Sequence, residues 1–101
     1  MAVLYVTEFN TIGGGGNFSV AGAQYPAVAE QTVAIAGASA QSSAFNKNTT
    51  FLRVHNDIAC SIEIGANPTA SLTTARMAAG QTEYFSVPSN LNFKIAVIAN
   101  P

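Results

Sequence analysis

The sequence predicts an all-β protein, either an antiparallel β-sandwich or a jelly-roll-like barrel, with little or no helix. Two observations predict this class. Apolar residues alternate with polar ones at a period of two, and turn-forming Gly, Pro, Asn and Asp separate the alternating stretches. The best helical candidate, residues 73–79, ends at Gly80 and can form one turn at most.

Two strands are predicted in the N-terminal half. Residues 3–9 are rich in β-branched and aromatic side chains, and residues 31–36 place Val33 and Ile35 on one face. Four consecutive glycines, Gly13 to Gly16, follow the first of these strands. We interpret them as a flexible connector or as a place where backbones pack closely.

Four more strands are predicted at residues 49–56, 58–65, 82–87 and 91–97. Buried faces are expected for Ile58, Cys60, Ile62 and Ile64 in the second of these, and for Leu91, Phe93, Ile95 and Val97 in the last. Asn56-Asp57 should link the first two as a tight hairpin, because Asn and Asp tolerate positive φ. Further corners are expected at residues 79–81 and 88–90.

The 101 residues form one β domain. Within residues 1–48, Gly13 to Gly16 and the Ala/Ser/Gln stretch at 36–44 have too few bulky apolar side chains to hold a core alone. We therefore expect a less regular N-terminal portion or arm at 1–48 and a compact β core at 49–101. The strand at 3–9, followed by its glycines, is expected either to swing out to a neighbouring subunit or to form an edge strand of its own domain. In the first case, Leu4 and Val6 would fill pockets on that neighbour.

Charge is unusually sparse. Charged residues make up 9% of the chain, against about 25% in a typical soluble domain, and the net charge is −1. Weak electrostatic repulsion suits a protein that functions in an assembly. The four basic residues are scattered, so we expect no nucleic-acid partner. Residues 95–99 are too short to span a bilayer and Glu8 interrupts any signal sequence, so we expect no membrane partner and an intracellular origin.

No catalytic group is predicted. His55 and Cys60 are close in sequence, but Cys60 shares the face of three isoleucines and should be a small core residue. Glu63 and Glu83 lie on separate predicted strands, and we expect them to pair with Arg53, Arg76 or Lys94 within the sheet or across a subunit interface. We expect no enzymatic activity, no catalytic residue, no bound metal and no cofactor, since no ligand spacing or phosphate loop is present.

Residues 53–98 resemble small β-sandwich virion proteins of tailed bacteriophages. The matching features are His55-Asn56-Asp57, a strand containing Cys60, Gly65-x-x-Pro68-Thr69, Ala79-Gly80-x-x-Glu83-Tyr84-Phe85 and Lys94-Ile95-Ala96-Val97-Ile98. Members of that group often have Leu-Pro in place of Met77-Ala78, and Gly in place of Asn90.

The resemblance implies a cement or decoration protein that stabilises the major capsid lattice. Its partners would be the major capsid protein and copies of itself, expected as a trimer at local three-fold points, in a virion assembled in the host cytoplasm. We expect the assembly interface to include Leu4, Val6, Arg53, Arg76 and Tyr84. Two alternatives stay open: a head–tail or tail accessory protein, and a carbohydrate-binding module of the virion using Tyr5, Tyr25 or Tyr84.

Overall fold

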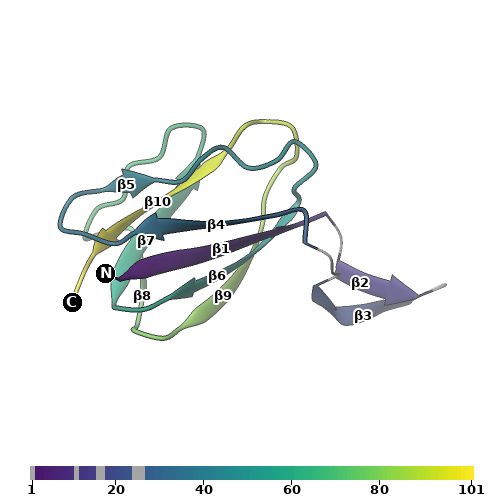
Figure 1. Cartoon of the computed structure of the whole chain (residues 1–101), viewed down its shortest axis with the longest axis horizontal. Helices are drawn as coiled ribbons and strands as arrows, with labels where there is room; N and C mark the ends of the chain where they lie inside the picture. Colours follow the sequence, from purple (N-terminus) through teal and green to yellow (C-terminus); the bar gives the residue numbers. More distant parts are fainter. Residues whose placement is uncertain (1, 11, 16–17, 24–26) are drawn as a thin grey trace.

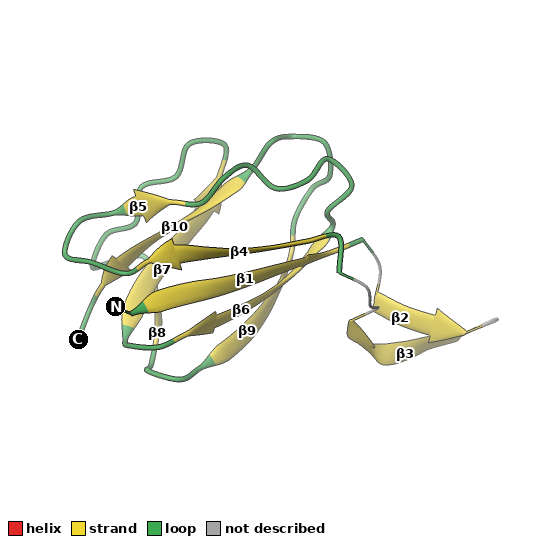
Figure 2. Cartoon of the chain, viewed as in Figure 1, coloured by secondary structure: helices red, strands yellow, loops and turns green. Residues whose placement is uncertain are grey.

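The computed structural model consists of two four-stranded antiparallel sheets and a separate two-stranded hairpin (Figures 1 and 2). It describes residues 2–10, 12–15, 18–23 and 27–101. No helix occurs among these residues, so the predicted all-β class is confirmed. In the same part of the chain, no helix is long and apolar enough to cross a membrane.

The first sheet has the strand order β4-β1-β6-β9. Its strands are β1 (Val3–Phe9), β4 (Ala29–Ala34), β6 (Phe51–Asn56) and β9 (Thr82–Ser86). All neighbours are antiparallel, and β1 lies between β4 and β6. Strands far apart in the sequence therefore share one surface.

The second sheet has the order β5-β10-β7-β8. Its strands are β5 (Ala40–Gln41), β7 (Cys60–Gly65), β8 (Ala75–Met77) and β10 (Lys94–Ala99). The short strands β5 and β8 were not predicted. Three residues of the one-turn helical candidate form β8 instead of a helix.

The core lies between the two sheets. Leu4, Val6, Leu52 and Val54 project from the first sheet, and Cys60, Ile62, Ile95 and Val97 project from the second. All eight are buried, in agreement with the alternation in the sequence. Val33 of β4, Met77 of β8 and three residues outside the strands, Ile35, Phe45 and Val87, complete this cluster.

The predicted N-terminal arm is wrong for residues 3–9. β1 is an interior strand of the first sheet, and Leu4 and Val6 are buried in the protein's own core. The reason is that both neighbours, β4 and β6, pair with β1 along nearly its whole length. The first half of the chain thus supplies part of the compact sandwich.

The predicted hairpin at Asn56-Asp57 is also wrong, because β6 and β7 belong to different sheets. The chain crosses from one sheet to the other at this point. Asp57 bonds to the start of β1, where Val3 N donates to Asp57 Oδ2 at 3.1 Å and Asp57 N donates to Val3 O at 3.2 Å. Ile58 lies in the crossing segment and is 40% exposed instead of buried.

The start of β10 is shifted relative to the prediction. Asn90 and Asn92 have positive φ, at 62° and 56°, and this left-handed backbone interrupts the extended pattern. Leu91 is therefore exposed, and Phe93 is only half-buried against the core. The corner at residues 79–81 is confirmed, and Gly80 adopts a φ of 72° there.

The hairpin of β2 (Ile12–Gly15) and β3 (Phe18–Ala23) projects beyond the end of the sandwich (Figure 1). Gly14 lies opposite Ser19, and Gly15 lies opposite Phe18. Three of the four consecutive glycines thus belong to a strand, which favours close backbone packing over a flexible connector; Gly16 is outside the described residues.

Candidate binding face

Several aromatic side chains in contact with one another lie on the outer surface of the first sheet. We call Tyr5, Phe51, Arg53, His55 and Tyr84 the aromatic face. They come from β1, β6 and β9, and each alternates with an inward neighbour such as Leu4, Leu52 or Val54. The strict period of two places them on one side of the sheet.

Tyr84 is the most exposed aromatic residue of this face, at 54%. Its ring stacks on Phe51, with centroids 5.6 Å apart and planes 12° apart. Arg53 lies directly opposite Tyr84 in the β6–β9 register, and opposite Thr7 in the β1–β6 register. We call Phe51, Arg53 and Tyr84 the Tyr84 cluster.

Tyr5 and His55 form a second group on the same face. They lie opposite each other in the register, with ring centroids 6.4 Å apart. His55 Nδ1 is 2.7 Å from Thr82 Oγ1, so a hydrogen bond ties the imidazole of β6 to the neighbouring strand β9. The Tyr5 ring is therefore supported on one side and remains exposed on the other.

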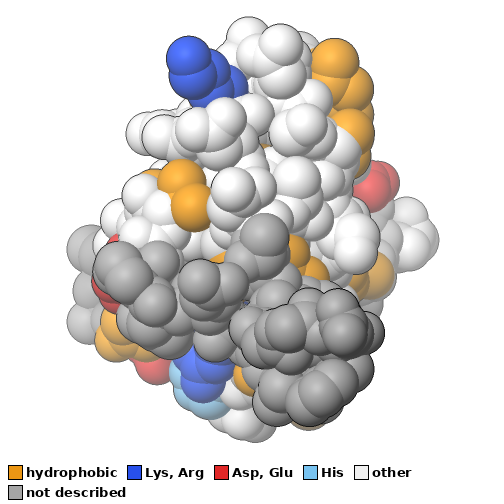
Figure 3. All heavy atoms as spheres, turned by 90° about the vertical axis from the view of Figure 1, so that its right-hand side faces the viewer, with side chains coloured by type: hydrophobic (Ala, Val, Ile, Leu, Met, Phe, Trp, Pro, Cys, Tyr) orange, Lys and Arg blue, Asp and Glu red, His pale blue; other side chains and the backbone are white. Residues whose placement is uncertain are grey.

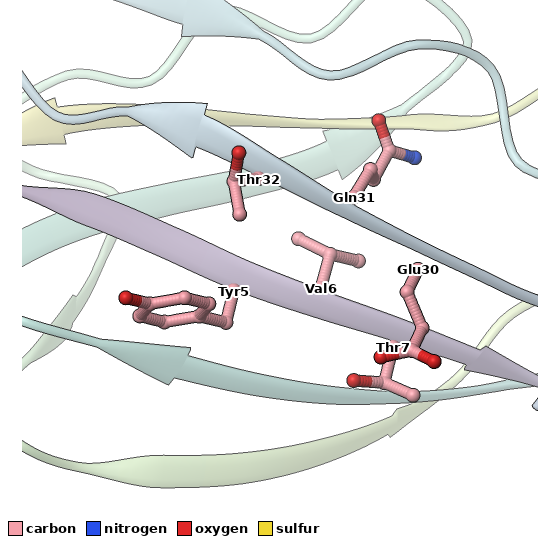
Figure 4. Close-up of a pocket in the computed structure, with 6 residues that line it drawn as sticks. All are labelled: Tyr5, Val6, Thr7, Glu30, Gln31 and Thr32. Atoms are coloured by element: carbon pink, nitrogen blue, oxygen red, sulfur yellow. The ribbon is translucent and has the colours of Figure 1, made fainter.

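An open depression lies beside Tyr5, between β1 and β4 (Figure 4). We call it the β1–β4 depression. Its lining residues are Tyr5, Val6, Thr7, Glu30, Gln31 and Thr32. Tyr5 lies opposite Thr32, and Thr7 lies opposite Glu30, so these four side chains occupy adjacent positions on the outer face.

The structure brings together only part of the predicted interface. Arg53 and Tyr84 are direct cross-strand neighbours on the aromatic face. Arg76 lies in the second sheet, where its Nε donates to Asn100 O at 3.0 Å. Leu4 and Val6 are buried, and contact with a neighbour would require β1 to leave the sheet. Of the three tyrosines, Tyr5 and Tyr84 share the aromatic face, and Tyr25 lies outside the described residues.

His55 and Cys60 do not face each other. His55 points outward from the first sheet, whereas Cys60 is buried in the core. Burial raises the pKa of the Cys60 thiol, although a hydrogen bond from Asn56 and the charge of Arg76 lower it in part. This environment favours the neutral thiol, which is a poor nucleophile. Glu63 and Glu83 also lie in different sheets.

A buried carboxylate was not predicted from the sequence. Glu8 is only 2% exposed and lies on the inner face of β1. Its Oε1 accepts hydrogen bonds from Asn46 N and Thr49 Oγ1, both at 2.7 Å, and its Oε2 accepts from Gln31 Nε2 at 3.0 Å. The signal was present in the sequence, because Glu8 continues the inward series of Leu4 and Val6.

Figure 3 shows the end of the molecule from which the hairpin projects, where the visible charged side chains are few and separate. Within the described ranges, no group of His, Cys, Asp and Glu could hold a metal ion. No family model, curated protein or solved structure matches this chain.

Proposed function

We propose that this protein is a non-enzymatic structural component of a tailed-bacteriophage virion, which binds the major capsid lattice as a cement or decoration protein. The proposal is supported by the resemblance over residues 53–98 and by the sparse charge of the chain. The observation that carries it is the Tyr84 cluster, in which the exposed Tyr84 lies on a regular sheet beside the half-buried Phe51 and Arg53.

This composition is typical of a protein–protein contact. Tyr, Phe and Arg are enriched at interfaces, and Tyr and Arg dominate the residues whose removal weakens binding most. The stack on Phe51 holds the Tyr84 ring before binding. Less side-chain entropy is then lost when a capsid subunit covers the ring.

The function that follows is mechanical. Each copy would contact adjacent capsid subunits and so share the pressure of the packaged DNA between them. A single contact of this kind can be weak, because the symmetric lattice repeats it many times. Self-association as a trimer would add valency at each local three-fold point.

Copy number in purified virions tests this proposal. Quantitative mass spectrometry should find on the order of hundreds of copies of the chain per particle, as lattice symmetry requires. About six or twelve copies would instead indicate the head–tail or tail position. Absence of the chain from the particle would overturn the proposal.

A matched pair of variants tests the role of the Tyr84 cluster. Tyr84 and Leu91 are both 54% exposed, so neither substitution to Ala should change stability by more than about 0.5 kcal/mol. Tyr84→Ala should lower the affinity for empty capsids about tenfold or more in co-sedimentation, whereas Leu91→Ala should leave it unchanged. Equal binding by both variants would exclude the Tyr84 cluster from the interface.

A further inference from the structure

We propose that the β1–β4 depression is a binding site for a neutral oligosaccharide. Tyr5 would provide the surface on which a sugar ring stacks, and Thr7, Glu30 and Thr32 would bind its hydroxyl groups. This site adjoins the Tyr84 cluster, because Thr7 lies opposite Arg53 in the β1–β6 register, but its lining residues are different ones. It rests on the placement of these four side chains and on the exposure of Tyr5, Glu30 and Thr32. Thr7 is only 7% exposed and forms the floor of the depression between them.

The four side chains form a regular two-by-two arrangement. Tyr5 and Thr7 are two residues apart on β1, and their partners Thr32 and Glu30 are two residues apart on β4. Paired Cβ atoms are about 5 Å apart across strands, and alternate residues are about 7 Å apart along a strand. The patch therefore matches one sugar ring in size.

The Tyr5 ring is suited to stacking. It is 44% exposed, and it is braced by His55, whose ring is tilted by 40° and tied to Thr82. The C–H faces of a pyranose are apolar, so they gain by covering the open side of an aromatic ring. Because Tyr5 is already positioned, little side-chain freedom is lost on binding.

The polar groups of the depression have unused hydrogen-bonding capacity. Among the described residues, the side chains of Thr7, Glu30 and Thr32 have no hydrogen-bond or ion-pair partner in the protein. The Glu30 carboxylate can accept two hydrogen bonds from neighbouring hydroxyls, and such charge-assisted bonds are stronger than neutral ones. The threonine hydroxyls can donate or accept.

The same carboxylate defines which sugars are excluded. None of the residues that line the depression carries a positive charge, and Glu30 carries a negative one. Uronic or sialic acids would place a second negative charge near Glu30, which is unfavourable. A neutral hexose or N-acetylhexosamine oligomer meets no such repulsion.

Backbone amide NMR of the full chain tests the site directly. The probes are tetrasaccharides of glucose, mannose and N-acetylglucosamine, with tetragalacturonate as the acidic probe. At least one neutral probe should shift the amide signals of residues 5, 7, 30 and 32, with a Kd on the order of 1 mM. Tetragalacturonate should bind at least about tenfold more weakly. The proposal is overturned if no neutral probe shifts these signals, or if the acidic probe binds equally well.

Variants separate stacking from nonspecific contact. Tyr5→Leu keeps an apolar side chain but removes the ring, and it should weaken neutral binding about tenfold. Ile58→Ala changes a residue of similar exposure, 40%, away from the depression and should leave binding unchanged. Glu30→Gln should reduce the difference in affinity between the neutral and the acidic oligosaccharides, because it removes the negative charge. Tyr5→Leu binding as tightly as the unmodified chain would overturn the proposal.

Discussion

At each end of the first sheet, one buried polar side chain forms hydrogen bonds to the neighbouring segments, but the two side chains have different chemistry. Asn56, opposite Leu4, closes one end and is fully buried. Glu8, opposite Leu52, closes the other end and is 2% exposed. An amide both donates and accepts hydrogen bonds, whereas an ionised carboxylate only accepts.

Asn56 uses both capacities. Its Nδ2 donates to Ile58 O at 2.7 Å and to Ala78 O at 2.9 Å, and its Oδ1 accepts from Gln81 N at 2.8 Å. Its backbone also accepts from Gly80 N at 3.0 Å. One neutral side chain thus joins the crossing segment to the corner before β9 without burying a charge.

Glu8 connects the segments at its end of the sandwich only by accepting hydrogen bonds. Its three donors, from Gln31, Asn46 and Thr49, are all neutral. Gln31 also forms two hydrogen bonds with the backbone of Ser43, and so extends the connection to the segment after β5. The comparison teaches that burying a carboxylate costs more desolvation than burying an amide, so the Asn56 end should contribute more net stability.

The largest expected effect is at Asn56. Asn56→Ala removes the side-chain hydrogen bonds to Ile58 O, Ala78 O and Gln81 N and should lower the free energy of unfolding by about 3 kcal/mol, at about 1 kcal/mol for each bond. Urea unfolding followed by circular dichroism measures this loss. Asn48→Ala, at an exposed position, is the control and should change it by less than about 0.5 kcal/mol. A loss below about 1 kcal/mol at Asn56 would show that the crossing segment repacks.

Substitution of Glu8 should have a smaller effect. Glu8→Gln keeps the shape but turns one acceptor into a donor that faces other donors, so it should cost about 1–2 kcal/mol. The relief of burying a charge offsets part of this loss. Thermal and urea unfolding measure it, with Glu30→Gln as the exposed control. A loss greater than at Asn56 would reverse the comparison between the two ends.

The smallest effect is expected at Cys60, which receives a 3.5 Å contact from Asn56 Nδ2. Cys60→Ala should cost about 1 kcal/mol at neutral pH because a small cavity opens. The raised thiol pKa means that the folded state retains the proton longer than the unfolded state, so this part of the stability is lost as the pH rises above about 9. Urea unfolding at neutral and alkaline pH should therefore show the variant's disadvantage shrinking, and a constant difference would contradict this.

The sequence predicted the positions and buried faces of the strands better than it predicted which strands pair with each other. Alternation identified Cys60, Ile62, Ile95 and Val97 as inward residues, because a half-buried strand has a local signature. Whether the chain turns back or crosses at Asn56 depends on the partners of β7, which are distant in sequence. Local turn chemistry alone could not distinguish a hairpin from a crossing.

The candidate site was less predictable for the same reason. Tyr5 and Tyr84 are distant in sequence and share a face only because β1, β6 and β9 lie in that spatial order. Exposed positions leave no hydrophobic pattern in the sequence from which their spatial neighbours could be predicted. The inward Glu8 was predictable from its phase with Leu4 and Val6, but its donors were not.

The position of β10 governs when the protein can complete folding during synthesis. β10 is an interior strand of the second sheet, between β5 and β7, yet its residues are the last of the ten strands to be made. Until residues 94–99 have left the ribosome, β5 lacks the strand with which it pairs, and among the described strands β7 has the short β8 beside it. The apolar inner side of the first sheet stays uncovered during that interval, when it is open to aggregation or to early contact with other chains.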